Sequence, residues 1–191
     1  MPERRGVWLA VLLLGLALPW AAWADATLEV CYNYGCMAQA EVTFSEAQLQ
    51  DLRGWLLMAD GPAAERGILA QVLGQMYGWA GAQSPISVDR PGDFLDDGVY
   101  GAMDCIDHAE TTTRFLHLLE DRGWLHFHRV APIRRRTRWV VAQHFSAVVQ
   151  QRQAEGEGPE FVMDTWFGEH GDPAVVLPLE DWLDGEGPNV S

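Results

Sequence analysis

Apolar residues recur at intervals of three and four in three segments of the chain, which is the spacing of a helix that buries one face. The segments are 45–59, 63–79 and 105–123. Ser45 is a favourable N-cap for the first helix. Gly123 ends the third, because glycine readily takes the left-handed conformation that closes a helix. The pattern therefore predicts three amphipathic helices.

Runs rich in β-branched and aromatic residues predict strands. One precedes the helices at 27–32, and three follow them at 125–133, 139–150 and 160–167, with a short helix expected at 178–183. Residues 81–101 are rich in glycine, proline and aspartate and predict a long loop, a feature that is often functional in compact domains. Helices followed by antiparallel strands predict an α+β domain with its helices packed on one sheet.

The first 24 residues have the layout of a secretory signal peptide. Arg4 and Arg5 form a basic region, residues 7–18 are almost wholly apolar, and small residues precede the expected cleavage site after Ala24. The apolar run is shorter than the roughly 20 residues of a membrane-spanning helix. We therefore expect a periplasmic or secreted protein with no stable membrane span after cleavage; an uncleaved N-terminal anchor is the alternative.

The chain is strongly acidic, with a formal net charge of −14 at pH 7. Loss of the signal peptide removes Glu3, Arg4 and Arg5 and makes the charge −15. A surface this negative argues against binding to nucleic acid or to anionic membranes. All thirteen basic residues are arginine, so the chain has no lysine amine to donate to a crosslink.

Three cysteines are an odd number for an exported protein. Cys31 and Cys36 in "CYNYGC" are close enough to form a disulfide around a small loop, with a structural role only. Cys105 is then left over as a free thiol in an oxidising compartment.

Cys105 is expected to be the first residue of a helix, with Asp104 as its N-cap and Asp107 completing a variant of the capping box. The free N–H groups of a helix N-terminus favour a thiolate and lower its pKa, and they can hold an oxyanion during acyl transfer. The two aspartates oppose the thiolate locally. The alternative is a small buried cysteine, because its apolar stripe continues through Ala109, Thr112, Leu116 and Leu119.

A nucleophilic thiol needs a base, and the base needs an orienting group. His144 lies within an apolar predicted strand and Asp164 lies in the next, both unusual places for polar side chains. In an antiparallel hairpin centred near residue 155, paired positions sum to about 310, and His144 and Asp164 sum to 308. They are therefore expected to be cross-strand neighbours. A buried His–Asp hydrogen bond with no catalytic role is the alternative.

The other histidines give weaker hypotheses. His108 lies one turn after Cys105 and is a second possible base. His126 and His128 share one face of a predicted strand and suggest a metal pair, although no third ligand has convincing spacing. His117 is expected on a helix surface and His170 in a loop. Cys105, His144 and Asp164 together predict a catalytic triad.

The order and spacing of these residues resemble the transglutaminase-like superfamily of papain-type thiol enzymes. That family has a cysteine opening a helix, an alanine four residues later, a closing glycine, and then an arginine, a histidine and an aspartate on successive strands. The matching residues here are Cys105, Ala109, Gly123, Arg129, His144 and Asp164. The "DC.D.A" pattern at 104–109 is similar to the bacterial periplasmic transglutaminase-like cysteine proteinases. Met103, Phe145 and Ser146 depart from the family pattern and leave the subfamily open.

The resemblance implies a papain/transglutaminase-like core over roughly 98–167, within a single domain of residues 25–191 whose N-terminal helical part is 45–80. It implies attack by Cys105 on an amide carbonyl, proton transfer by His144, orientation by Asp164, and an oxyanion site at the N–H of Cys105. Tyr100 or a side chain of the preceding loop is a candidate second donor. No cofactor is expected, although calcium occurs in the similar proteinases and Asp93, Asp96 and Asp97 are candidate ligands.

The sequence therefore predicts an exported thiol hydrolase that cleaves a peptide or isopeptide amide in a protein or peptide substrate. One alternative is acyl transfer of the transglutaminase type. Others are a non-catalytic binding domain of the same fold and a structural envelope protein whose Cys105 pairs with another chain. The oligomeric state stays open.

Overall fold

The structure is a computed structural model that describes residues 24–92, 95–138 and 142–188. Within them the chain is mixed helix and antiparallel sheet, which confirms the α+β class. The strands are β1 (Ala26–Tyr32), β2 (Ala38–Phe44), β3 (His128–Arg138), β4 (Ala142–Gln151), β5 (Glu160–Asp164) and β6 (Val175–Pro178). The α-helices are α1 (Glu46–Leu56), α2 (Pro62–Gly81), α3 (Cys105–Asp121) and α4 (Leu179–Leu183), with a short 3₁₀ turn, η1, at Pro85–Val88.

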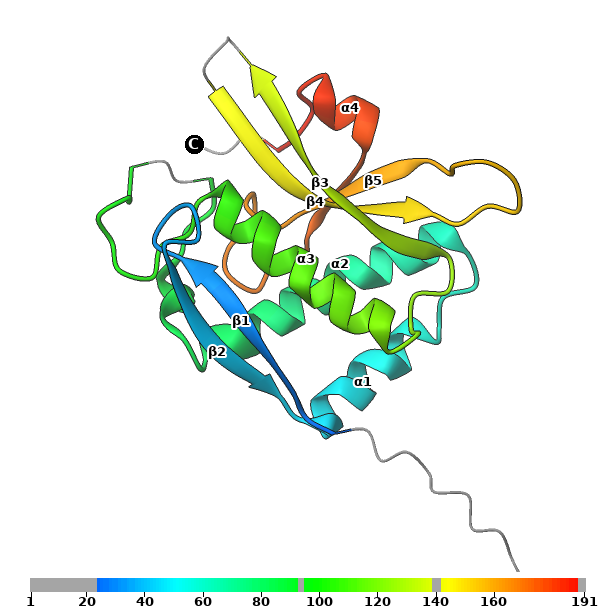
Figure 1. The fold of residues 1–191 in the computed structure, drawn as a ribbon, viewed down its shortest axis with the longest axis horizontal. Coiled ribbons are helices and arrows are strands. Elements are labelled where there is room, and N and C mark those ends of the chain that lie inside the picture. Colours follow the sequence, from blue (N-terminus) through cyan, green and yellow to red (C-terminus); the bar gives the residue numbers. More distant parts are fainter. Residues whose placement is uncertain (1–23, 93–94, 139–141, 189–191) are drawn as a thin grey trace, which may run out of the picture.

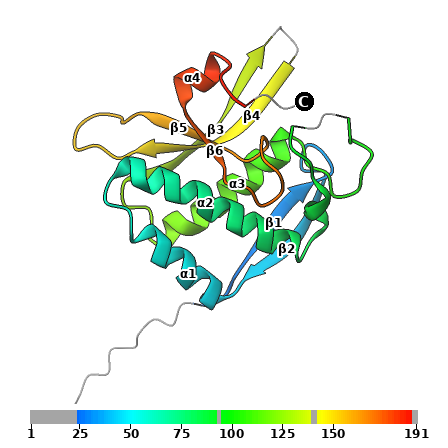
Figure 2. The same cartoon turned by 180° about the vertical axis from the view of Figure 1, so that it is seen from behind.

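Four strands form one sheet in the order β3-β4-β5-β6, and β1 and β2 form a separate hairpin. Helix α3 lies in the middle of the molecule, between the four-stranded sheet and the hairpin (Figure 1). Helix α2 crosses α3 and completes that layer (Figure 2). The N-terminus of α3 is therefore held between elements that are far apart in the sequence.

The two faces of the sheet are covered differently. Alternate residues of a strand point to opposite faces. Ala147 and Met163 join the main core with the helices, whereas Val148 and Val162 pack with Trp182 of α4. Helix α4 therefore covers the face of the sheet that α3 does not cover.

Local chemistry fixes the helix boundaries. Ser45 caps α1 in a capping box with Gln48, and Asp104 caps α3 in a capping box with Asp107. Gly123 follows α3 with a φ of 71°, the left-handed conformation expected of a glycine after a helix. These caps confirm the expected starts of α1 and α3.

Several boundaries differ from the sequence-based prediction. The sequence pattern does not predict β2 or β6, and the predicted loop 81–101 contains η1. The strand expected from 125 begins at His128, and the one expected to reach 167 ends at Asp164, where the chain turns to bring Trp166 back to the carboxylate. The predicted signal peptide, apart from residue 24, lies outside the described residues, as do 139–141 at the start of a predicted strand. None of the helices described is long and apolar enough to span a membrane.

Candidate active site

Cys105 is the first residue of α3, and its side chain is buried, with 8% of the residue exposed. One carboxylate oxygen of Asp104 accepts the N–H groups of Ile106 and Asp107 at 3.0 and 2.9 Å. Asp107 in turn accepts the N–H of Asp104 at 3.1 Å. The cap therefore uses the second and third N–H groups of the helix, whereas that of Cys105, the first, interacts with the residue's own thiol.

His144 and Asp164 form a direct hydrogen bond, with 2.7 Å between His144 Nε2 and Asp164 Oδ2. The β4–β5 register pairs Ala147 with Met163, so paired positions sum to 310 as the sequence predicts. Asp164 is two positions from direct pairing with His144 and thus on the same face of the sheet. The two side chains predicted to be cross-strand neighbours are brought together.

Asp164 is almost completely buried and accepts two further hydrogen bonds. Trp182 Nε1 donates to Oδ2 at 3.0 Å, and the backbone N–H of Trp166 donates to Oδ1 at 3.3 Å. Buried carboxylates need such donors, because an unpaired buried charge is strongly destabilising. The three donors fix the carboxylate that orients the His144 ring.

The second ring nitrogen of His144, Nδ1, is not used in the hydrogen bond to Asp164. A carboxylate only accepts hydrogen bonds, so Nε2 carries the proton of this bond, and in the neutral ring Nδ1 keeps a lone pair. Nδ1 is buried and has no hydrogen-bond partner within the described part of the chain. The ring is enclosed by Trp166, Phe167 and Trp182, with centroids at 4.9, 5.3 and 5.6 Å.

Arg136 borders the site from β3, the strand next to the one that carries His144. It is the direct β3 partner of His144, and its guanidinium lies 4.7 Å from the Trp182 ring centroid. Its Nη1 donates to the backbone carbonyls of Trp182 and Glu186 at 2.6 and 2.8 Å. Arg136 therefore ties α4 and the residues after it to the strand pair that carries His144.

Cys105 reaches the same region from α3. It belongs to a small cluster with Trp166 and Phe167, the rings that also enclose His144, and Phe145 packs against this cluster. The backbone N–H of Phe145, the residue directly after His144, interacts with the Cys105 thiol and lowers its pKa. Cys105 and the His144–Asp164 pair therefore border the same two rings, Trp166 and Phe167, although no direct contact between Cys105 and His144 is among those of the described residues.

Burial dominates the electrostatics of the thiol and raises the pKa of Cys105 to about 11. The N–H groups of Phe145 and of Cys105 itself act in the opposite direction, and the charges of Asp104 and Asp164 raise the pKa further. The expectation of a lowered thiol pKa at the helix N-terminus is therefore wrong. Burial outweighs the helix N-terminus, and the resting side chain is a neutral thiol.

His108, the second candidate base, has other partners. Its Nε2 lies 2.8 Å from Asp89 Oδ2, and its Nδ1 lies 2.9 Å from Thr165 Oγ1. Asp89 also accepts the N–H of Met103 at 2.7 Å. This buried cluster anchors the segment that precedes Cys105 to α3 and to the residue after Asp164. No motif in the sequence indicates this role of Asp89.

The suggested metal pair has a different arrangement. His128 is fully buried, and its Nδ1 lies 2.8 Å from Glu65 Oε1. Glu65 also accepts the backbone N–H groups of His126 and Phe127. His126 precedes β3, so the two histidines do not share a strand face. This cluster joins α2 to the start of the sheet.

Other residues singled out in the sequence lie outside the His144–Asp164 cluster. Arg129 bonds to Gln150, exposed His117 lies beside Glu120, and His170 packs against Tyr77. Tyr100 is mostly exposed, and its hydroxyl lies 3.2 Å from that of Tyr32.

The candidate metal ligands also have other contacts. Of the proposed calcium ligands, Asp93 lies outside the described residues and Asp96 accepts a hydrogen bond from the Tyr34 hydroxyl. Among described residues, Cys31, Cys36 and Asp107 form a group of potential metal ligands, but its two sulfurs are joined in a disulfide.

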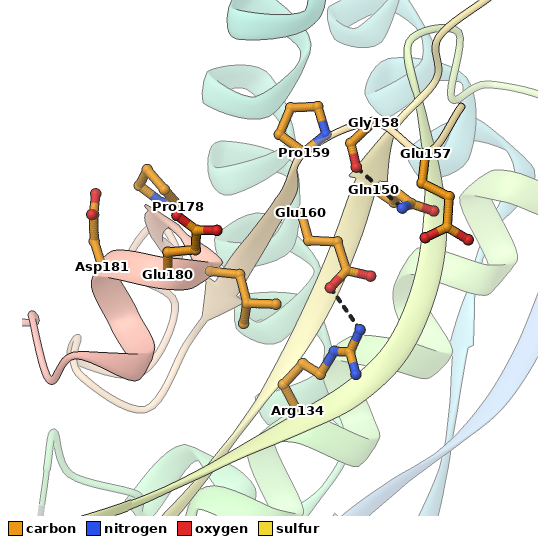
Figure 3. A pocket seen from close by; sticks show the side chains of 10 residues that line it. Arg134, Gln150, Glu157, Gly158, Pro159, Glu160, Pro178, Glu180 and Asp181 are labelled. Atoms are coloured by element: carbon orange, nitrogen blue, oxygen red, sulfur yellow. Dashed lines mark hydrogen bonds and ion pairs between the residues drawn. The ribbon is translucent and has the colours of Figure 1, made fainter. Parts of the chain in front are cut away.

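A pocket of about 480 Å³ lies elsewhere on the sheet (Figure 3). Its walls come from β3, the β4–β5 turn and the start of α4, and Arg134 and Glu160 form an ion pair across it at 2.7 Å. Cys105, His144 and Asp164 do not line it.

No model of a known protein family matches the chain, and neither does any curated protein or solved structure.

Proposed function

We propose that the protein is a thiol hydrolase that cleaves a peptide or isopeptide amide with Cys105, His144 and Asp164. The observation that carries the proposal is the state of the His144 ring. Its Nε2 is bonded to Asp164, and its Nδ1 is buried and unpartnered within the described residues, beside the strand position whose N–H interacts with the Cys105 thiol. A cysteine on a helix that contacts the same two rings as a His–Asp pair from adjacent strands also favours a papain/transglutaminase-like core.

The chemistry begins with proton transfer, because burial keeps the thiol protonated. Nδ1 of His144 takes the proton from Sγ of Cys105 as sulfur bonds to the carbonyl carbon. The N–H of Cys105 stabilises the oxyanion, and Asp164 stabilises the imidazolium.

The imidazolium then gives its proton to the leaving amine nitrogen, the C–N bond breaks, and an acyl-enzyme thioester remains. Water attacks this thioester while Nδ1 accepts its proton. The C–S bond breaks, the carboxylic acid leaves, and the proton passes from Nδ1 to sulfur to restore the thiol. Each proton passes through one atom, Nδ1, so the reaction requires that this nitrogen be unprotonated at the start.

Acyl transfer to an amine would follow the same first half, and we propose hydrolysis because water is always present as the acceptor. The burial of Cys105 argues against a structural role in which it forms a disulfide with another chain. We also propose that the protein is exported. The Cys31–Cys36 disulfide supports this, since disulfides persist in oxidising compartments.

Substrate cleavage tests the proposal. We expect the wild-type protein, incubated with a native protein extract, to generate new N-termini that mass spectrometry detects and that Cys105→Ala does not generate. Isopeptide cleavage would appear as freed lysine amines. Incorporation of a tagged primary amine at glutamine, without new N-termini or freed lysines, would identify a transferase instead. Identical product sets for the wild type and Cys105→Ala would refute thiol catalysis.

A further inference from the structure

The disulfide between Cys31 and Cys36 closes a turn of unusual backbone conformation. We call residues 31–36 the disulfide turn. Asn33, Tyr34, Gly35 and Cys36 have successive φ values of 64°, 63°, 66° and 56°. All four values lie in the left-handed region, which residues other than glycine rarely adopt. Consecutive N–H groups in such a turn converge and can bind anions.

The N–H groups of the disulfide turn bind the carboxylates that cap α3. Tyr34 N and Cys36 N donate to Asp107 at 2.8 and 2.5 Å, and Gly35 N donates to Asp104 at 3.0 Å. These partners are about 70 positions apart in the sequence. The turn thus holds the two acidic residues that flank Cys105 on either side.

Burial and charge repulsion explain why these carboxylates need the N–H donors of the turn. Burial and the neighbouring charge of Asp104 raise the pKa of Asp107 to about 6, while its backbone N–H donors oppose this rise. Further contacts fix the same region: Asn33 donates its N–H to Ala102 O, and its side chain accepts the N–H of Gly101, both at 2.8 Å. The segment just before Cys105 and the first turn of α3 are therefore both attached to the disulfide turn.

We propose that the disulfide turn is the positioning element of the active site and that reduction of the Cys31–Cys36 bond switches Cys105 off. This rests on the proposed role of Cys105 as the nucleophile. The disulfide holds the left-handed turn, the turn holds Asp104 and Asp107, and these hold the first turn of α3. Once the bond is broken, the backbone of the turn can leave this rare conformation and its N–H groups separate from the carboxylates.

A dithiol is the class of reductant that the switch requires. Its first thiolate attacks Sγ of Cys36, which is partly exposed, whereas Cys31 is fully buried. The S–S bond breaks, and Cys31 leaves as a thiolate that takes up a proton. The second thiolate attacks the mixed disulfide, which frees the Cys36 thiol and leaves the reductant as its own disulfide. The protein gains two electrons and two protons.

Redox cycling of the full chain with dithiothreitol, followed by desalting and reoxidation, tests the inference. Two quantities are measured: amide hydrogen exchange at Ile106 and Asp107, and the modification rate of Cys105 by a peptidyl electrophile, located by peptide mapping. We expect reduction to speed exchange at least tenfold and to slow modification at least tenfold, and reoxidation to restore both. Exchange at Leu116, inside α3, should stay unchanged, which separates this effect from loss of the fold.

The double variant Cys31→Ser/Cys36→Ser is the matched control and should resemble the reduced protein without responding to redox cycling. Unchanged exchange with a reactive Cys105 in both redox states would overturn the inference and leave the proposed function intact. Redox-dependent exchange with an unreactive Cys105 in both states would support positioning of α3 but overturn the switch, because the proposed nucleophile would itself have failed.

Discussion

The substitution Asp164→Asn is expected to slow modification of Cys105 by a peptidyl electrophile by about 10²- to 10⁴-fold. The neutral amide can still accept the hydrogen bonds of His144 and Trp182. It cannot stabilise the positive charge that His144 gains when it takes the thiol proton. The rate constant is measured by intact-mass spectrometry at neutral pH, with the melting temperature as the check on folding.

Asp181→Asn is the matched control. Asp181 is exposed on α4 next to Trp182, and none of its contacts among the described residues involves Cys105, His144 or Asp164. Its rate should equal that of the wild type. If Asp164→Asn also reacted within a factor of two of the wild type, Asp164 would be a structural residue only.

The substitution Trp182→Ala is expected to lower the free energy of unfolding by about 3–5 kcal/mol. Trp182 is fully buried and packs with Val148 and Val162. Its loss leaves a cavity under α4 and removes the indole donor from Asp164. Urea denaturation measures the effect as a lower midpoint with an unchanged slope.

Two further variants separate the contributions of Trp182. Trp55→Ala removes a partly exposed tryptophan on α1 and should cost about 1 kcal/mol or less. Trp182→Phe keeps most of the packing but removes the hydrogen bond to Asp164, so it should slow Cys105 modification severalfold with a smaller loss of stability. Equal losses for Trp182→Ala and Trp55→Ala would show that α4 does not support the site as described.

Local interactions explain what could be predicted from the sequence. The caps at Ser45 and Asp104 depend on residues three positions apart, and a hairpin fixes its own register once its turn is located. His144 and Asp164 are joined by one such hairpin. Their contact could therefore be predicted from their spacing, although the catalytic role that we propose for them could not.

Contacts between distant segments explain what could not be predicted. The disulfide turn meets Asp104 and Asp107 across about 70 positions, and nothing in "CYNYGC" indicates a partner. Whether the pKa of Cys105 is raised or lowered depends on how deeply the N-terminus of α3 is buried, which the local sequence does not reveal. Strands β2 and β6 are stabilised by their neighbours, and β6 has only four residues.

The pH dependence of Cys105 modification, compared between the wild type and His144→Ala, tests the central claim most directly. If Nδ1 of His144 takes the thiol proton, the wild-type protein reacts at neutral pH, far below the thiol pKa of about 11. In His144→Ala the rate should be about 10²- to 10⁴-fold lower at pH 7 and should rise about tenfold per pH unit towards the thiol pKa of about 11. His117 is an exposed histidine on α3, the helix that begins at Cys105, and the variant His117→Ala should follow the wild type. Superimposable profiles for the wild type and His144→Ala, both rising towards pH 11, would contradict the account.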